Sequence, residues 1–300
     1  LAHIKKTGIH KETIYTCYVI QQRKLLGIVS AKDLMTTDDN VLIEDIMETE
    51  IISVSTLTDK EDVAHQLRKY DLLALPVLDT DGLLVGIVTF DDAMDVMVEE
   101  ATEDITKMAA VSPSEKTYFE VSAWEHAKRR IPWLLVLMFS SIITGTIITR
   151  YEDAFAAIPL LVSFIPMLMD TGGNCGSQAS VSVIRGISLN EIEFSDLLQV
   201  IWKEIRVAVI CGVALSAANF VKLMLVDRLL FHNQLVTIPV AAVICSTMVC
   251  TVLCAKLVGC TLPLLAKKIG FDPAVMASPF ITTIVDAISL LIYFQFASAI

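Results

Sequence analysis

Long apolar runs almost free of charge fill the second half of the chain, and they constrain its fold more than any other feature. Residues 131–149 and 235–255 contain 19 and 21 residues without Asp, Glu, Lys or Arg. An α-helix needs about 20 apolar residues to cross the hydrocarbon core of a bilayer. Three further runs carry a single charge each, at residues 154–184, 207–226 and 273–300. The sequence therefore predicts five membrane-spanning helices.

Acidic residues gather in the other half of the chain. Residues 1–127 hold 24 Asp and Glu against 11 Lys and Arg, whereas residues 128–300 hold 10 against 12. Such a surface repels phosphates, which excludes nucleic acid as a partner, and it suits cations. Residue 1 is Leu rather than Met, so we expect the chain to lack its true start.

The cations lie at alternate ends of the apolar runs, which predicts the topology. They precede the first run, separate the second from the third, and separate the fourth from the fifth: Lys128, Arg129, Arg130; Arg185, Lys203, Arg206; Lys267, Lys268. Short cytoplasmic loops are enriched in Lys and Arg. We therefore expect a multi-pass protein of the plasma membrane with a cytoplasmic N-terminus and a C-terminus outside.

Two carboxylates interrupt the apolar runs. Asp286 lies 13 residues into the last run, and an Asp at the centre of a spanning helix costs roughly 2.5–3.5 kcal/mol. Such a residue should face water, an ion or a partner, although hydrogen bonds to Thr or Ser of its own helix are an alternative. Asp170, in the second run, is either a second pathway group or a residue near the membrane surface.

Asp170 belongs to a glycine-rich segment, residues 166–185, which reads PMLMDTGGNCGSQASVSVIR. The glycines could unwind a helix and expose carbonyl oxygens to an ion. Alternatively, Gly172 and Gly176 have the spacing that lets two helices approach closely. Asn174 and Gln178 add neutral oxygens, which suit Mg²⁺ because that ion gives up its water shell reluctantly.

A repeat organises the acidic half. Residues 25–35 (LLGIVSAKDLM) and 84–94 (LVGIVTFDDAM) agree at six of eleven positions, and each predicts a strand followed by the start of a helix. A second strand precedes each copy, at residues 18–20 and 76–78, and a helix over 59–70 precedes the second pair. This tandem βαββα order resembles a pair of CBS domains, the first lacking its opening elements. The resemblance implies a regulatory unit that binds adenosyl nucleotides or ions.

Residues 91–111 contain neither Gly nor Pro and predict a helix with acidic faces. Asp92, Asp95, Glu99 and Glu103 follow each other in steps of three and four residues, and Glu100 and Asp104 form a second pair. Like charges at this spacing repel one another, and a divalent cation between them would reverse the sign. An ordinary acidic surface helix is the alternative.

Together, the CBS-like pair, the acidic helix, the five spans and the pattern P-x(6)-G-N-x-G-x-Q from Pro166 to Gln178 resemble the MgtE-type magnesium transporters. The resemblance implies a multidomain fold: an α/β CBS pair over residues 1–90, an acidic connecting (plug) helix and linker over 91–127, and an all-α transmembrane pore domain of five helices over 128–300. It also implies a homodimer with its pore on the two-fold axis. The family's acidic N-terminal domain has no counterpart in this sequence, so a sensor site shared with that domain would be incomplete.

The resemblance further implies which residues handle magnesium, both as the transported and as the regulatory ion. For the ion pathway we predict Asp286, Gly173, Asn174, Gly176 and Gln178, together with Asp170. For metal binding we predict carboxylates that close the pore when intracellular Mg²⁺ bridges them, and Asp286 in the pore itself: Asp59, Glu61, Asp71, Asp92, Asp95, Glu100, Glu103, Asp104, Asp272 and Asp286.

Alternative functions remain open at this point. The chain could carry another divalent cation such as cobalt, act as a sodium-coupled exporter, or be a nucleotide-sensing regulatory protein anchored in the membrane, with ATP or another adenosyl nucleotide at the CBS pair. The sequence contains no phosphate-binding glycine loop, nucleophile elbow or His-rich metal cluster. We therefore do not expect an enzyme.

Overall fold

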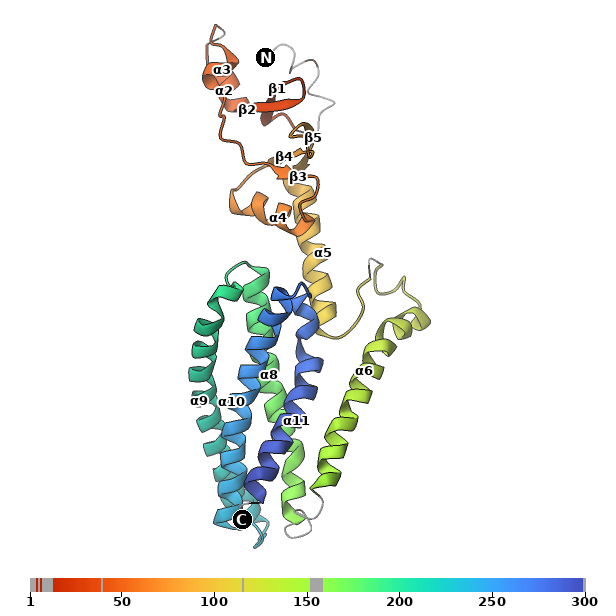
Figure 1. The fold of residues 1–300 in the computed structure, drawn as a ribbon, viewed down its shortest axis with the longest axis vertical. Helices are drawn as coiled ribbons and strands as arrows, with labels where there is room; N and C mark the ends of the chain where they lie inside the picture. The colour runs from red at the N-terminus through yellow and green to blue at the C-terminus, as the bar shows by residue number, and fades with distance from the viewer. Residues whose placement is uncertain are drawn as a thin grey trace. The chain divides into compact units, whose positions relative to one another are not determined.

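The computed structural model describes residues 4, 6, 13–38, 40–114, 116–151 and 159–298 (Figure 1). The chain divides into two compact units, Leu1–Thr102 and Glu103–Ile300. The division falls within helix α5 (Phe90–Met108), inside the region that the sequence predicts to connect the two domains. The start of the second predicted span, residues 154–158, lies outside the described residues.

The first unit contains two hairpins, as the repeat predicts. Strands β1 (Thr16–Gln21) and β2 (Lys24–Ser30) pair antiparallel and lead into short helices α2 (Ala31–Thr36) and α3 (Ile43–Ile46). The second copy runs through β3 (Val54–Ser55), α4 (Lys60–Lys69), β4 (Ala74–Leu78) and β5 (Leu84–Thr89) into α5. In its sheet, β3 is parallel to β4, and β4 is antiparallel to β5.

Local chemistry explains these elements. Helix α2 begins where the Ser30 hydroxyl accepts a hydrogen bond from the backbone N–H of Asp33, a common way to satisfy a free N–H at a helix start. The turn between β4 and β5 uses Gly82 at a φ of 76°, a left-handed conformation that glycine adopts without strain. Leu67 and Leu75, both fully buried, form the core between α4 and the sheet.

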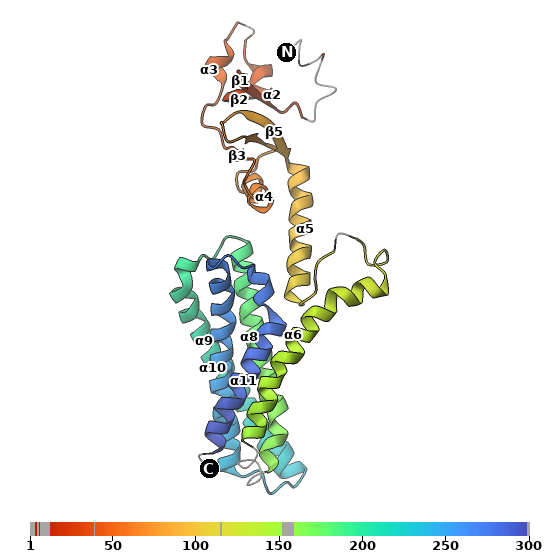
Figure 2. The ribbon, with the colours of Figure 1, turned by 45° about the vertical axis from the view of Figure 1, so that its right-hand side comes forward.

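The second unit is a bundle of five long helices. They are α6 (Ala123–Arg150), α8 (Ile165–Ser188), α9 (Leu197–Lys222) with its π-helical extension η4 (Leu223–Leu230), α10 (Ile238–Lys268) and α11 (Ser278–Ala297). Short 3-10 helices precede α8, α9 and α11: η2 (Pro159–Phe164), η3 (Phe194–Asp196) and η5 (Pro273–Met276). Helix α10 packs against α8, α9 and α11, α8 packs against α11, and α6 lies against α11 (Figure 2).

Four of these segments are long and apolar enough to cross a membrane: Ala123–Arg150, Phe194–Leu230, Ile238–Lys268 and Pro273–Ala297. Helix α8 occupies the fifth predicted span and is long enough, but it falls outside this set. The predicted fold class, an α/β unit followed by an all-α domain with membrane-spanning helices, is confirmed. Buried Leu168, Ile244, Val252 and Phe294 hold the bundle together.

Candidate functional site

One face of helix α8 consists of glycines packed tightly against α10 and α11. A Cβ atom added to Gly172 would lie 2.7 Å from Cγ2 of Thr251, and one added to Gly173 would lie 2.8 Å from Cγ2 of Thr282. At Gly176 the corresponding distance to Cγ2 of Ile281 is 2.8 Å. Real Cβ atoms essentially never approach so closely, so these positions require glycine.

The glycine-rich segment is therefore not unwound. Helix α8 runs without a break from Ile165 to Ser188, through all three glycines. Of the two interpretations that the sequence left open, close packing of helices is the one that the structure supports. The deciding residue comes from another helix: a Cβ atom added to Gly259 of α10 would overlap the backbone of Gly176, so only glycine at position 259 allows this approach.

A second stripe of α8 is polar and exposed within the single chain. Asp170, Asn174 and Gln178 are all exposed and follow each other at intervals of four residues, which places them along one stripe of the helix. Exposure of this stripe to hydrocarbon would be costly because an Asp in a spanning helix costs roughly 2.5–3.5 kcal/mol. The stripe therefore needs water, a cation or a second copy of the chain beside it.

Asp286 lies near the middle of α11, the ninth of its 20 residues. Its side chain is half-buried, and its Oδ1 atom is buried without a hydrogen-bond partner in the part of the chain that the structure describes. Ser289, a residue that could have satisfied it, instead donates its hydroxyl proton to the backbone carbonyl of Val285 at 2.6 Å. The alternative in which Asp286 is tied up by hydroxyl groups of its own helix thus receives no support.

Asp286 and Asp170 also interact electrostatically, although they come from different helices. Two carboxylates repel each other, and water screens this repulsion less where one of them, here Asp286, is half-buried. A cation between or beside them would relieve the repulsion. This pair, with the neutral oxygens of Asn174 and Gln178 on the same stripe as Asp170, is an arrangement suited to a hydrated cation.

A buried ion pair lies elsewhere in the bundle. Lys256 of α10, 4% exposed, has its Nζ atom 3.8 Å from Oε2 of Glu204 on α9. This contact neutralises the charge of Lys256, the one cation between residues 235 and 266. Breaking one side of such a pair would leave an uncompensated charge in a membrane-embedded domain.

A second cluster of charges forms around Lys107, near the end of α5. Its ammonium group contacts Oδ2 of Asp272 at 2.5 Å and also pairs with Glu103, one turn earlier on the helix. Burial alone would lower the pKa of Lys107, but the hydrogen bonds and charges of Asp272 and Glu103 outweigh it and raise that pKa above its usual value. Next to Glu103, Asp104 accepts a hydrogen bond from the hydroxyl of Ser188 at 3.1 Å.

The remaining predicted metal ligands lie in the first unit, where they have other contacts. Asp59 caps α4 by accepting a hydrogen bond from the N–H of Glu61 at 2.9 Å. Glu100 pairs with Lys60 at 3.0 Å, and Asp92 accepts a hydrogen bond from the Thr89 hydroxyl at 2.9 Å. Glu61 lies 3.6 Å from His65, Asp71 has a φ of 50°, and Asp95 lies on exposed helix surface.

Within the described ranges, no three His, Cys, Asp or Glu side chains come close enough to hold a metal ion. The structure thus brings together Asp170 with Asp286, and Glu103 with Asp272, but it does not gather the whole predicted ligand set. Sequence reasoning missed Lys107. The only local signal for it was its position four residues after Glu103, because its second partner, Asp272, lies 165 residues away.

The architecture defines the class: a helical bundle with membrane-spanning segments joined to an α/β unit of the CBS type. Residues 165–296 match the MgtE family model, described as a divalent cation transporter, and residues 43–99 match the CBS domain. This match assigns residues 165–296 to the MgtE family.

Named relatives align with nearly the full length of this chain. The chain is 38% identical over 296 residues to the magnesium transporter MgtE of Enterococcus faecalis, covering 98% of this chain and 63% of that protein. It is 35% identical over 298 residues to magnesium transporter MgtE of Thermus thermophilus, covering 99% of this chain and 64% of the relative. The chain therefore spans less than two thirds of the length of these relatives.

Solved structures resemble the chain over about a third of its length. The soluble part of a magnesium transporter is 47% identical and covers 33% of this chain and 39% of that one, with a TM-score of 0.32. The cytosolic domain of the Mg²⁺ channel MgtE in complex with ATP is 40% identical and covers 32% of this chain and 39% of that one, with a TM-score of 0.31.

Proposed function

We propose that the chain conducts Mg²⁺ across the plasma membrane through a pathway lined by Asp286 and by the exposed stripe of α8. The observation that carries this proposal is the half-buried Asp286 of α11, whose Oδ1 atom has no hydrogen-bond partner in the described part of the chain. The exposed polar stripe of α8, which includes Asp170, supports it. Oxygen ligands of this kind suit a hard cation that keeps several waters. The names of the relatives support the choice of Mg²⁺ as the substrate.

The stripe also supports a homodimer. Asp170, Asn174 and Gln178 are exposed in one chain, and a second copy facing them would enclose a polar channel between two α8 helices. Gly173 and Gly176 then act behind the channel wall, where their close contacts to α11 hold the stripe in position. The Lys and Arg distribution supports a cytoplasmic N-terminus and an external C-terminus.

The substitution Asp286→Asn tests the pathway, because it removes the charge and keeps the shape. We expect it to abolish Mg²⁺-dependent growth of a strain that lacks its own magnesium uptake. Asp227→Asn is the matched control, since Asp227 belongs to the same unit but pairs with Lys222 at 2.7 Å. Wild-type growth of the Asp286 variant would remove this residue from the pathway. Flux into liposomes with Mg²⁺ and Co²⁺ in competition distinguishes the cation transported.

For regulation, we propose that intracellular Mg²⁺ favours a closed state by binding carboxylates at the end of α5. Glu103, Asp104 and Asp272 are the residues that would hold it, because the structure places Glu103 and Asp272 around one ammonium group. A divalent cation bound there supplies positive charge that carboxylates from two elements can share. Lys107 supplies one positive charge at the same place, so it and Mg²⁺ compete for these carboxylates.

A second candidate function, nucleotide sensing, has support from the first unit. A hollow of about 320 Å³ lies between the two hairpins, lined by aromatic, apolar and acidic residues that include Tyr15, Tyr18, Ile52 and Asp71. Aromatic rings and apolar side chains suit an adenine base, and a carboxylate suits ribose hydroxyls. Calorimetry with ATP and AMP on the chain tests this. If nucleotide binds and liposomes show no cation flux, the protein is a membrane-anchored sensor.

A further inference from the structure

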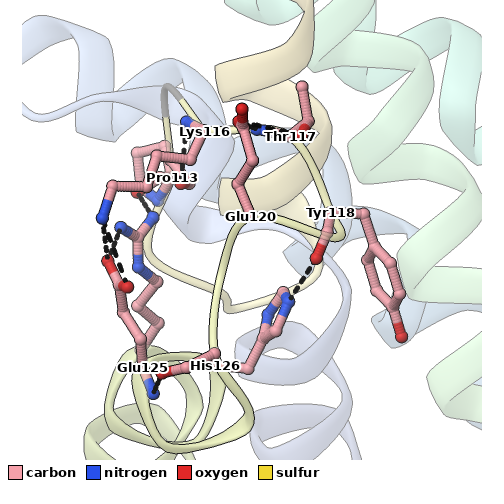
Figure 3. A network of polar contacts seen from close by, with 10 residues as sticks. Pro113, Lys116, Thr117, Tyr118, Glu120, Glu125 and His126 are labelled. Carbon is pink, nitrogen blue, oxygen red and sulfur yellow. Dashed lines mark hydrogen bonds and ion pairs between the residues drawn. The ribbon is translucent and has the colours of Figure 1, made fainter.

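The segment between α5 and α6 folds back onto the first turns of α6, and its contacts determine which cations remain available there (Figure 3). Arg129 donates from Nη1 to the carbonyl oxygen of Pro113 at 2.7 Å and pairs with Glu125 at 2.9 Å. Lys116 pairs with the same Glu125 at 3.4 Å. One carboxylate thus pairs with two cations, and these contacts fix the segment on the helix.

The neighbouring cations are not neutralised in this way. Lys128 places its ammonium group 5.7 Å from the centre of the Trp124 ring, a cation–π contact that leaves its charge in place. Arg130 is exposed and makes no ion pair or hydrogen bond with any residue that the structure describes. Two positive charges therefore remain at the point where α6 becomes apolar.

Arg130 lies at the rim of a hollow of about 440 Å³ on this side of α6. Tyr118, Ala123, His126 and Ala127 line the hollow before Arg130 in the chain, and Ile131 and Leu134 line it further along the helix. All polar groups of the lining thus lie at or before Arg130, and the lining beyond it, in the direction of the membrane span, is apolar. A phospholipid has this same order, a charged headgroup followed by hydrocarbon.

Exposed aromatic side chains include Tyr118 of the hollow and neighbours of its lining residues in the chain. Phe119 and Tyr118, from the folded-back segment, are 95% and 70% exposed, and Trp124 is 68% exposed. Aromatic side chains of this kind are enriched where a membrane protein meets the headgroup layer. A second copy of the chain at this place would bring Lys128 and Arg130 against their own equivalents, whereas an anionic headgroup brings the opposite charge.

We propose that this hollow binds one anionic phospholipid. The guanidinium group of Arg130 binds the phosphate, as a planar fork of N–H donors does well. Lys128 adds to the attraction of an anionic membrane surface for this segment. Ile131 and Leu134 contact one acyl chain. The lipid then links the segment after α5 to the first spanning helix, through the residues that Glu125 and Arg129 hold in place.

Native mass spectrometry of the detergent-purified full chain tests the proposal, with phosphatidylglycerol and phosphatidylcholine added in equal amounts. We expect preferential retention of one phosphatidylglycerol per chain. Arg130→Gln should lower that retention about tenfold, the effect of losing a charge-assisted hydrogen bond. Ala127→Phe should lower it as well, because the ring takes up space in the hollow next to Arg130 without changing any charge.

Arg206→Gln is the matched control. Arg206 is an exposed arginine of α9 that lies 5.9 Å from the ring of Trp202, as Lys128 lies near the ring of Trp124. It does not line this hollow. Its loss should change retention less than twofold. Equal loss in both arginine variants would mean diffuse attraction to the membrane surface and would overturn the proposal. Unchanged retention in Ala127→Phe, or displacement of the lipid by inorganic phosphate, would overturn it too.

Discussion

The contact between Gly259 and Gly176 gives the sharpest test of how α8 is positioned. A Cβ atom added to Gly259 would overlap the carbonyl oxygen of Gly176 and would lie 3.0 Å from its carbonyl carbon and 3.2 Å from Cβ of Ala179. The overlapping atoms belong to the backbone, so no side-chain rotation relieves the clash. In Gly259→Ala the two helices must move apart.

The magnitude follows from two opposing terms. Overpacking of a tight interior costs about 1–3 kcal/mol, and a rigid backbone contact places this case at the upper end. Alanine in place of glycine within a helix returns about 1 kcal/mol. We therefore expect a net loss of about 2 kcal/mol in the free energy of unfolding, which for a unit of this size lowers the melting temperature by about 4–8 °C.

The assay is thermal unfolding of the detergent-solubilised chain, followed by size-exclusion chromatography after heating. Gly145→Ala is the matched control, because Gly145 lies on α6 and an added Cβ would find no atom within 4 Å. This control should melt at the wild-type temperature or slightly above it, since only the helix-propensity gain remains. If Gly259→Ala melted as high as Gly145→Ala, the inferred contact between α8 and α10 would be wrong.

Two further predictions concern the carboxylates. Lys107→Gln should lower, by about tenfold, the Mg²⁺ concentration needed to protect α5 from proteolysis, because Mg²⁺ no longer competes with an ammonium group for Glu103 and Asp272. An unchanged protective concentration would rule out this competition. Because the pKa of Lys107 is raised, its ammonium group stays fully charged below the usual lysine pKa of about 10.4, and the charge is lost only as the pH rises through the higher folded pKa. The difference in Mg²⁺ concentration between the wild type and Lys107→Gln should therefore be equal at pH 6 and pH 9. Asp59→Ala should destabilise the first unit by about 1 kcal/mol and Asp59→Asn by much less, since Asn also caps helices. Equal losses of stability in the two variants, measured by urea unfolding, would exclude a capping role. Weaker Mg²⁺ binding by the Asn variant would show that Asp59 also binds the metal.

The sequence predicts the first unit well because its signals are local. The repeat at residues 25–35 and 84–94 predicts the strands β2 and β5, and each pairs with the strand predicted before it. The parallel pairing of β3 with β4 leaves no such signal, since it joins Val54 to Val77 across an intervening helix. Registers of this kind depend on tertiary packing, which a single sequence does not display.

The charges in the second unit show the same limit. The sequence correctly indicates that Asp286 is unusual, because any carboxylate deep in an apolar run is unusual. It does not indicate that Lys256 pairs with Glu204 or that Lys107 meets Asp272, since those partners lie on separate elements. A lone cation in a predicted span can therefore be a pathway residue or half of a buried pair, and only its neighbours decide which.

The composition of helix α8 departs from that of an ordinary spanning helix, and its packing explains why. It is the one long helix of the described bundle outside the set that is apolar enough to cross a membrane by composition. Its hydropathy is lower for two reasons. One face carries the glycines that close packing with α10 and α11 requires, and another carries the polar stripe of Asp170, Asn174 and Gln178. Neither side suits contact with lipid, so α8 must be enclosed by protein and water on both. One face is enclosed within the chain, and the other needs the water-filled, cation-binding surroundings that we propose.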